Sequence, residues 1–303
     1  MAYPTPQVTN TTAAVFIPEI WSDEVIAAYK ANLVAANLFK KMSFKGKKGD
    51  TIHIPKPTRG QASLKASETA VTLIAAEEDE VKVLIDKHYE YSRFIEDITE
   101  VQALSSMRRF YTDDAGYALA KQVDTDMVQL GRVMNGGTAG ADYDAGYVGG
   151  SATSELYNGS NASVLTDPAI RNMIQKLDDQ DVPTSGRFFL IPPAARNTLM
   201  GLDRYTAMDF VGEAASSNTI RNGQIGNLYG IPVYVTSNAD TATGTDRVCL
   251  MGHKDAAVLV EQLNVRSQTQ YKQDYLSTLY TSDTIYGVKE LREDSAFALV
   301  IPA

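Results

Sequence analysis

The chain has 303 residues, of which 44% are hydrophobic and 21% are charged, so wholesale disorder and a coiled-coil composition are excluded. The net charge of −9 argues against a protein that gains its affinity by neutralising many phosphates, because that work requires clustered lysine and arginine. The length suffices for roughly two domains with a hydrophobic core.

The sequence also shows neither a targeting segment nor the cysteines for a disulfide framework. The sequence contains no run of eighteen apolar residues, and its first twenty residues lack the basic and apolar regions of a signal peptide. Its single cysteine, Cys249, excludes an intramolecular disulfide framework, and its apolar neighbours place it in the core. We therefore expect a soluble protein that is made in a cytoplasm.

The first 19 residues are expected to form an extended arm, because residues 1–18 contain three prolines and no charged side chain. Residues 20–49 are expected to hold a helix. It would begin near Ser22, run to about residue 42, and present Trp21, Val25 and Tyr29 on one apolar face. That face requires a partner.

Two alternating stretches follow and predict the arms of a long β-hairpin over residues 50–91. Residues 50–55 form the first stretch and residues 81–91 the second. The segment between them is rich in alanine, serine, threonine and lysine, so it is too polar to pack as a core element. Long loops of this kind in compact domains are usually functional or mobile.

Charge reverses within this region. Residues 30–65 contain nine basic side chains and one acid, Asp50, whereas residues 68–100 contain ten acids and three basic side chains. Two solvated faces that neutralise each other within one hairpin explain the pattern, and so does complementarity between copies of the chain. The sequence leaves both explanations open.

The remaining elements follow in order along the chain. A long spine helix is expected over residues 98–134, with a break possible near Ser105 and Ser106 and with Gly116 as a close-packing point. Residues 136–163 predict a surface loop or a domain junction. An α/β pattern comes next, with a helix after Thr166, a buried strand over 188–191 and a helix from Pro193.

The segment 223–238, GQIGNLYGIPVYVTSN, predicts a glycine-punctuated turn and a short strand that begins near Pro232. Five strands are expected beyond it, over residues 248–251, 257–260, 265–271, 279–288 and 297–301.

Motifs for catalysis or cofactor binding are absent from the sequence. His53, His88 and His253 do not have metal-ligand spacing, and the phosphate-loop, dinucleotide-binding, nucleophile-elbow and HExxH patterns do not occur. The three acids Asp178, Asp179 and Asp181 are explained by an acidic helix end before a proline. We therefore predict no catalytic, cofactor-binding or metal-binding residue.

The order of these motifs resembles that of the major capsid proteins of tailed bacteriophages, which have the HK97-like (Hong Kong 97-type) fold. The segments that carry the resemblance are GDTIHIPKP (49–57), LDDQDVPTSGRFFLIPPAARNTLM (177–200) and GQIGNLYGIPVYVTSN (223–238). The resemblance implies an α+β fold with an N-terminal arm (1–19), an N-terminal helix (20–49), an E-loop hairpin (50–91), a peripheral P domain (92–135 and 253–303) and an axial A domain (136–252).

The resemblance also implies a function and partners. Copies of the chain would form hexamers and pentamers of an icosahedral shell around double-stranded DNA, which they would contact only by non-specific proximity. The protein would have no enzymatic role and no membrane partner, would assemble in the host cytoplasm and would reside in the virion. Because the helix starts near residue 20, we expect a separate scaffolding protein. A portal protein is a further expected partner, and decoration proteins are an option.

With that fold in mind, we hypothesise that a basic surface of the hairpin docks on an acidic surface of a neighbouring subunit. The candidate residues are Lys45, Lys47, Lys48, Lys56, Arg59 and Lys65 on the basic side and Glu77, Glu78, Asp79 and Glu80 on the acidic side. Some relatives crosslink an E-loop lysine to a neighbour's asparagine. Lys65 could be nominated for that role, although a lysine in a polar loop is usually only solvated.

Two other functions remain open at this stage. An encapsulin-like bacterial nanocompartment would share the fold, but the long charged hairpin and the arm favour a phage. A soluble α/β enzyme with an unrecognised site is the alternative from a different class.

Overall fold

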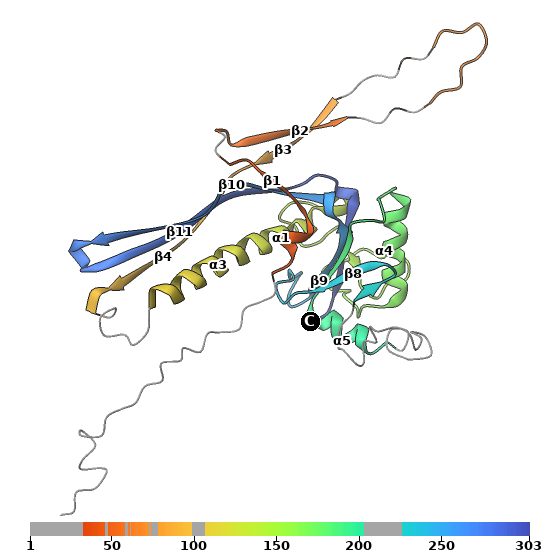
Figure 1. Ribbon diagram of the computed structural model, residues 1–303. Helices are drawn as coiled ribbons and strands as arrows, with labels where there is room; N and C mark the ends of the chain where they lie inside the picture. The colour runs from red at the N-terminus through yellow and green to blue at the C-terminus, as the bar shows by residue number, and fades with distance from the viewer. Residues whose placement is uncertain are drawn as a thin grey trace, which may run out of the picture.

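The computed structural model of the chain describes residues 33–45, 48–57, 60, 62–71, 73, 78–98, 107–202 and 226–303. They form a body with two mixed sheets and a separate two-stranded hairpin that projects from it (Figure 1). The expected α+β fold class is confirmed. The predicted arm over residues 1–19 lies outside the described residues.

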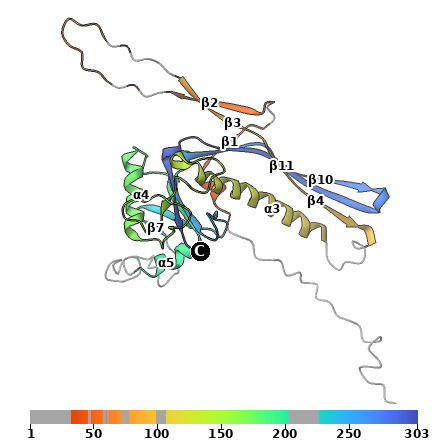
Figure 2. The same ribbon diagram turned by 180° about the vertical axis from the view of Figure 1, so that it is seen from behind.

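The first sheet has four strands in the order β1-β10-β11-β4. Its strands are β1 (Lys40–Ser43), β10 (Ala257–Lys272), β11 (Ser277–Glu290) and β4 (Lys87–Glu96). All its pairings are antiparallel except that of β1 with β10. Helix α3 (Met107–Gln129) runs along one face of the sheet (Figures 1 and 2), where Met127 packs with Leu259 and Tyr286.

The second sheet has six strands in the order β5-β12-β9-β6-β8-β7. Its strands are β5 (Tyr147–Val148), β12 (Ala296–Ile301), β9 (Arg247–His253), β6 (Arg187–Ile191), β8 (Ile231–Val235) and β7 (Asn227–Leu228). Helices α4 (Asp167–Asp179) and α5 (Pro193–Met200) contribute to the core on one of its faces.

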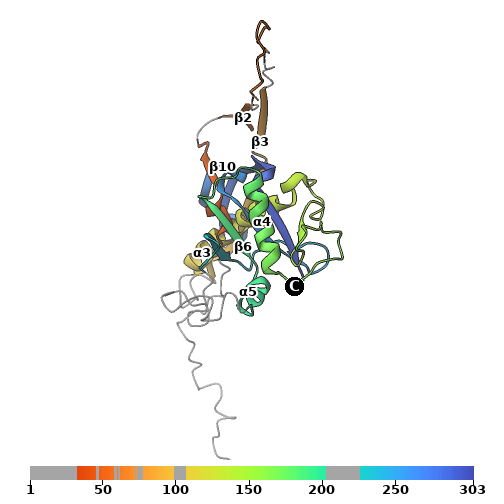
Figure 3. The same cartoon turned by 90° about the vertical axis from the view of Figure 1, so that its right-hand side faces the viewer.

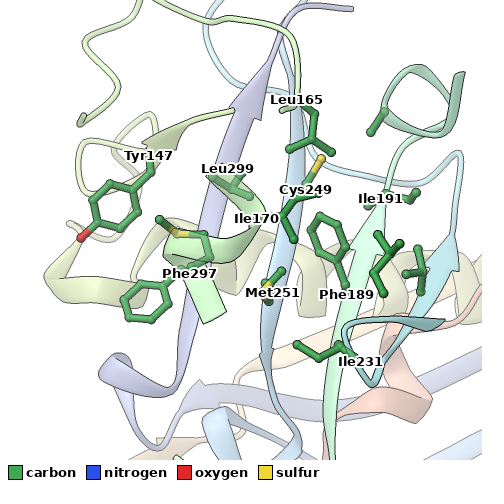
Figure 4. Packing of buried hydrophobic residues seen from close by; sticks show 14 of the residues in the cluster. Tyr147, Leu165, Ile170, Phe189, Ile191, Ile231, Cys249, Met251, Phe297 and Leu299 are labelled. Atoms are coloured by element: carbon green, nitrogen blue, oxygen red, sulfur yellow. The ribbon is translucent and has the colours of Figure 1, made fainter. Parts of the chain in front are cut away.

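Strand β6 shows why this second sheet is apolar on both faces. Phe189 and Ile191 belong to the core cluster with α4 and α5, whereas Phe188 and Leu190 pack in the cluster that holds α1 (Ala35–Leu38) and the end of α3. A strand covered on both sides has a continuous apolar run rather than an alternating one. Cys249 lies on β9 within the first cluster (Figure 4) and is completely buried, as the sequence predicts.

The hairpin consists of β2 (Thr51–Pro57) and β3 (Glu78–Leu84), which pair only with each other. Figure 3 shows it projecting from the two-sheet body, and its base packs on the first sheet, where Val83 lies with Val258 and Val260 in one core cluster. A hydrogen bond of 2.8 Å from the Ile85 amide to the Asp50 carbonyl closes its base. The second arm predicted over residues 81–91 is confirmed only for residues 81–84, because the alternating run is divided at Asp86 and residues 87–91 belong to β4.

The N-terminal helix also differs from the expectation for residues 20–42. Residues 1–32 are outside the described part, α1 covers only Ala35–Leu38, and Lys40–Ser43 forms β1. Register explains the change, because Lys40 pairs with Val258 and Ser43 with Glu261 of β10. Sheet pairing over these four residues overrides their helical periodicity.

The spine helix is confirmed from Met107 to Gln129, and the predicted start and the possible break near Ser105 lie among residues that are not described. The α-helix does not continue to residue 134, because tighter 3-10 turns cover Leu130–Arg132 and Met134–Gly136. Gly116 is not a close-packing point: a Cβ there would have no heavy atom within 4 Å.

Two sequence expectations around the second sheet have different outcomes. The glycine-punctuated turn is confirmed: Tyr229 and Gly230 both have positive φ, as a two-residue type I′ hairpin between β7 and β8 requires. The segment 136–163 is not only a surface loop, because Tyr143, Tyr147 and Tyr157 are buried within it.

The C-terminal strands are also found where expected, with one difference. The two strands expected over 257–260 and 265–271 are a single strand, β10, whose register with β11 shifts between Glu261 and Leu263 and again before Arg266. Such bulges increase local twist without ending a strand.

Gly287 of β11 lies where the chain passes from the hairpin into β4. A Cβ at this position would come within 2.2 Å of the Leu84 carbonyl oxygen and 3.1 Å of the Ile85 Cα. Since both are backbone atoms, Gly287→Ala requires the crossing strand to move. We expect it to lower the free energy of unfolding by about 1–3 kcal/mol, as overpacking does. Urea unfolding of the unassembled subunit measures this loss.

Gly116→Ala is the matched control for this prediction. The site is open, and alanine is favoured over glycine inside a helix by about 1 kcal/mol. The control should therefore be at least as stable as the parent chain. Equal urea unfolding midpoints for Gly287→Ala and Gly116→Ala would show that the backbone crossing at Gly287 tolerates a side chain.

Candidate assembly surfaces

The hairpin carries most of the residues predicted to dock on a neighbour. Lys45 and Lys48 lie before β2, Lys56 lies on β2 and Lys65 lies in the loop, and all four are exposed. Asp79 and Glu80 are exposed on β3, and Glu78 begins that strand. Lys47, Arg59 and Glu77 lie outside the described residues.

Within the hairpin, strand pairing brings opposite charges together. Lys56 is the Cα partner of Asp79, and His53 Nδ1 lies 2.8 Å from Glu80 Oε2. Lys82 Nζ lies 2.9 Å from the other oxygen of the same carboxylate. Hydrogen bonds from Lys82 and His53 lower the pKa of Glu80. Part of the charge reversal therefore serves contacts inside one chain.

Sequence reasoning missed the apolar side chains of the hairpin loop. Leu64, Val71 and Leu73 are 101%, 65% and 87% exposed. Large apolar residues in a segment that has no core of its own are the signal that could have identified them, because such residues gain most when another surface covers them.

A second apolar surface lies at the far end of the first sheet, near the turn between β10 and β11. Phe94, Tyr275 and Leu276 are 54%, 70% and 66% exposed, and the Phe94 and Tyr275 rings lie 5.8 Å apart. Tyr271 donates a hydrogen bond of 2.8 Å to Asp97 beside them. The sheet thus ends in an exposed aromatic tip.

At the middle of β11, Asp283 holds a charged cluster. Its carboxylate accepts hydrogen bonds from Arg266 Nε at 3.1 Å and Nη2 at 2.7 Å, and His88 Nε2 lies 3.4 Å away. The Arg266 hydrogen bonds lower the pKa of Asp283, and His88 lowers it further, whereas burial acts in the opposite direction.

Two buried carboxylates of α3 hold together the body of the subunit, which carries the hairpin and the aromatic tip. Asp126 accepts hydrogen bonds from Tyr286 Oη at 2.7 Å and Gln122 Nε2 at 3.1 Å, and it pairs with Lys87 Nζ at 2.9 Å. Asp124 accepts hydrogen bonds from the Ala36 amide at 3.2 Å and from Asn238 at 3.0 Å. One helix is thereby tied to the first sheet, to α1 and to the loop that follows β8.

A third carboxylate, Asp240, joins the end of the spine to the loop after β8. It accepts hydrogen bonds from Arg132 Nε at 2.8 Å and Nη2 at 3.2 Å and from the Tyr143 hydroxyl at 2.8 Å. Burial, followed by the Asp240 charge, raises the pKa of Tyr143, so the phenol stays protonated and remains a donor.

The described residues contain no group of three or more His, Cys, Asp or Glu side chains that could hold a metal ion. Within the same residues, no helix is long and apolar enough to cross a membrane. The ion pairs described above hold structure together, and the exposed features are a projecting hairpin and an aromatic tip. Exposed apolar surfaces of this kind are typical of a structural subunit that contacts other chains.

Comparison with known proteins identifies the family of this structural subunit. A profile of the phage capsid protein family matches residues 95–296. Among curated sequences, no protein matches this chain. A solved structure from Mycobacterium phage Che8 is 25% identical with a TM-score of 0.76, and the match covers 94% of this chain and 97% of that one.

Two further structures share the fold at lower identity. The capsid structure of the cyanophage P-SCSP1u is 19% identical with a TM-score of 0.74, and the match covers 99% of each chain. The mature capsid of bacteriophage PhiM1 is 14% identical with a TM-score of 0.69, and the match covers 94% of this chain and 92% of that one.

The chain belongs to the phage capsid protein family. It is a major capsid protein of a tailed bacteriophage, a structural protein of the capsid shell with the HK97-like fold. The encapsulin-like compartment and the α/β enzyme are not favoured. The domain boundaries remain a prediction, although β12 lies between β5 and β9 in the second sheet.

Replacing Asp240 by asparagine tests the joint at the end of the spine. The variant loses the charge that holds Arg132. The asparagine amide oxygen is also a weaker hydrogen-bond acceptor for the buried Tyr143 hydroxyl than the carboxylate is. We expect the free energy of unfolding to fall by about 1.5–3 kcal/mol, the range for hydrogen bonds to charged groups. Asp179→Asn, at an exposed position near the end of α4, is the control. The same loss in both variants would argue against a specific joint.

The Asp283 cluster predicts a pH dependence. Because the folded pKa is below the unfolded value of about 3.9, the stabilisation is present above that pH and disappears as pH falls through the folded pKa. Arg266→Gln should therefore lower the free energy of unfolding near neutral pH only slightly, because Arg266 is half exposed and solvent screens the pair. Unfolding curves from pH 7 to pH 2 should show the two proteins converging, and a constant difference would contradict this.

Proposed function

We propose that copies of this chain associate into hexamers and pentamers of an icosahedral shell around double-stranded DNA, with the β2–β3 hairpin lying across a neighbouring copy. The observation that carries the proposal is the outer part of the projecting hairpin. The base packs on the body, where Val83 lies with Val258 and Val260, but the part beyond it has no such cover, and a two-stranded ribbon is at best marginally stable alone. Covering Leu64 and Leu73 on a neighbour would stabilise both chains.

In this proposal, residues 1–19 form the N-terminal arm, residues 20–49 the N-terminal segment and residues 50–91 the E-loop. The peripheral domain takes residues 92–135 and most of 253–303, and the axial domain takes residues 136–252. Strand β12 is added to the axial sheet, because its hydrogen-bonded neighbours β5 and β9 belong there.

The geometry of the hairpin reduces the number of residues that are good candidates for docking on a neighbour. Lys56 lies opposite Asp79, and Glu80 is paired with His53 and Lys82, so these residues are partly neutralised in the subunit. Lys48 and Lys65 are exposed and lie away from that pairing, at the base and in the loop of the hairpin. They are the better candidates for contact with an acidic surface of a neighbour.

Further partners follow from membership of the family rather than from any contact in the subunit. We propose that assembly takes place in the host cytoplasm with a separate scaffolding protein and a portal protein, and that decoration proteins are optional. Packaged DNA would meet the inner wall only by proximity, which suits a chain with a net charge of −9.

The double variant Lys48→Glu/Lys65→Glu tests the docking of the hairpin. We expect a lower yield of closed shells than with the parent protein and a changed dependence of that yield on salt, because like charges would face each other. Lys121→Glu/Lys254→Glu changes the net charge equally at exposed positions outside the hairpin. Electron microscopy and sedimentation of protein expressed with its scaffold, across a series of sodium chloride concentrations, measure the yield.

The two variants separate the possible results. A shell yield for Lys48→Glu/Lys65→Glu that matches the parent at every salt concentration would remove the charge contact from the proposal. Equal losses in both variants would mean that net charge, not hairpin docking, controls assembly. Discrete monomers under all conditions, for the parent protein as well, would contradict the shell function itself.

A further inference from the structure

A groove lies between α1, α3 and the first sheet. It has a volume of about 460 Å³, which is within the range of ligand-binding pockets in proteins. Its lining includes Leu119, Ala120 and Val123 of α3, Leu259 and Val265 of β10, and Leu33 at the start of the described chain.

Several polar groups of the groove have partners within the subunit. Asp124 accepts from the Ala36 amide and from Asn238, and the Tyr286 hydroxyl donates to Asp126. The rim is polar and includes the exposed residues Asn37, Lys41 and Asn264. Between these groups, Val265 is 51% exposed, and Ala120 is also exposed. The groove therefore fits an amphipathic occupant that turns an apolar side inward.

The sequence just before the groove has the matching pattern. Trp21, Val25 and Tyr29 recur every four residues, which places them on one side of a helix. Lys30 and Asp23 fall on the opposite side. Since Leu33 itself lines the groove, Tyr29 is tethered within about 14 Å of it even in a fully extended chain. Proximity alone gives this segment a high local concentration at the groove.

We propose that the groove binds the apolar side of residues 21–29 of the same chain, with Tyr29 seated nearest to Leu33. Binding would attach the N-terminal segment along the spine helix and would fix the direction in which the preceding arm leaves the subunit. The proposal concerns the single subunit and does not depend on how the hairpin docks.

Cysteine crosslinking tests this placement in the full-length chain. Tyr29→Cys combined with Ala120→Cys puts one thiol on the predicted apolar side and one at the groove. Cys249 does not compete, because it is completely buried and burial raises the pKa of its thiol. Mild oxidation or a short bismaleimide, applied to dilute unassembled subunit, should give an intrachain crosslink that peptide mapping locates.

Two matched variants make the result specific. Lys30→Cys with Ala120→Cys moves the first thiol to the opposite side of the predicted helix, and Tyr29→Cys with Gln268→Cys moves the second to an exposed position on β10 outside the groove. Both should crosslink several-fold more slowly. Equal rates for all three pairs, or no crosslink at all, would overturn the proposal, and an exclusively interchain product would assign the groove to a second copy.

A measurement without cysteines provides an independent check. Tyr29→Ala should lower the urea midpoint of the subunit, because an apolar contact in the groove is lost, whereas Lys30→Ala should leave the midpoint close to that of the parent. The chain's single tryptophan, Trp21, also reports on the site. Its emission should shift to longer wavelength in Val265→Lys but not in the exposed control Thr269→Lys. Unchanged midpoints and emission would contradict the seating of this segment.

Discussion

The architecture depends on two carboxylates that the spine helix buries in its final turns. Asp124 and Asp126 are two residues apart, so their side chains leave the helix in roughly opposite directions. Burying a charge costs several kcal/mol unless it is paired and hydrogen-bonded. Each carboxylate therefore requires its own set of donors, Ala36 and Asn238 on one side and Lys87 and Tyr286 on the other. These requirements fix the helix against the first sheet, α1 and the loop after β8.

The same constraint positions the hairpin. Lys87, which pairs with Asp126, begins β4, and the hairpin ends only three residues earlier at Leu84. The intervening backbone crosses directly over Gly287, where no side chain would fit. The base of the projecting ribbon is thus held by a charge on one side and by a glycine on the other. Its direction is set by the body, on which Val83 of the ribbon packs with Val258 and Val260 of β10.

Local chemistry explains which elements the sequence predicts well. The turn at Tyr229 and Gly230, the buried strand over 187–191 and the proline-led helix at Pro193 are encoded by residues adjacent in sequence, and all are found. Residues 40–43 and 81–91 could not be assigned in this way. Lys40–Ser43 is extended because β10 pairs with it, and the run after Val81 is divided because Lys87 is drawn to a buried aspartate 39 positions away.

The candidate assembly residues show the same limit. The charge reversal is plain in the sequence, but its division into internal and external contacts depends on strand register, which places Lys56 beside Asp79 and leaves Lys65 outside. Charges engaged within the hairpin contribute little to a second chain, since exposed pairs are individually weak. Affinity between copies would then come mainly from apolar side chains such as Leu64 and Leu73, with the loop lysines setting register and rate of encounter. If the hairpin docks as proposed, its charges would keep the ribbon in solution before assembly, because the apolar contacts would form only when a neighbour is present.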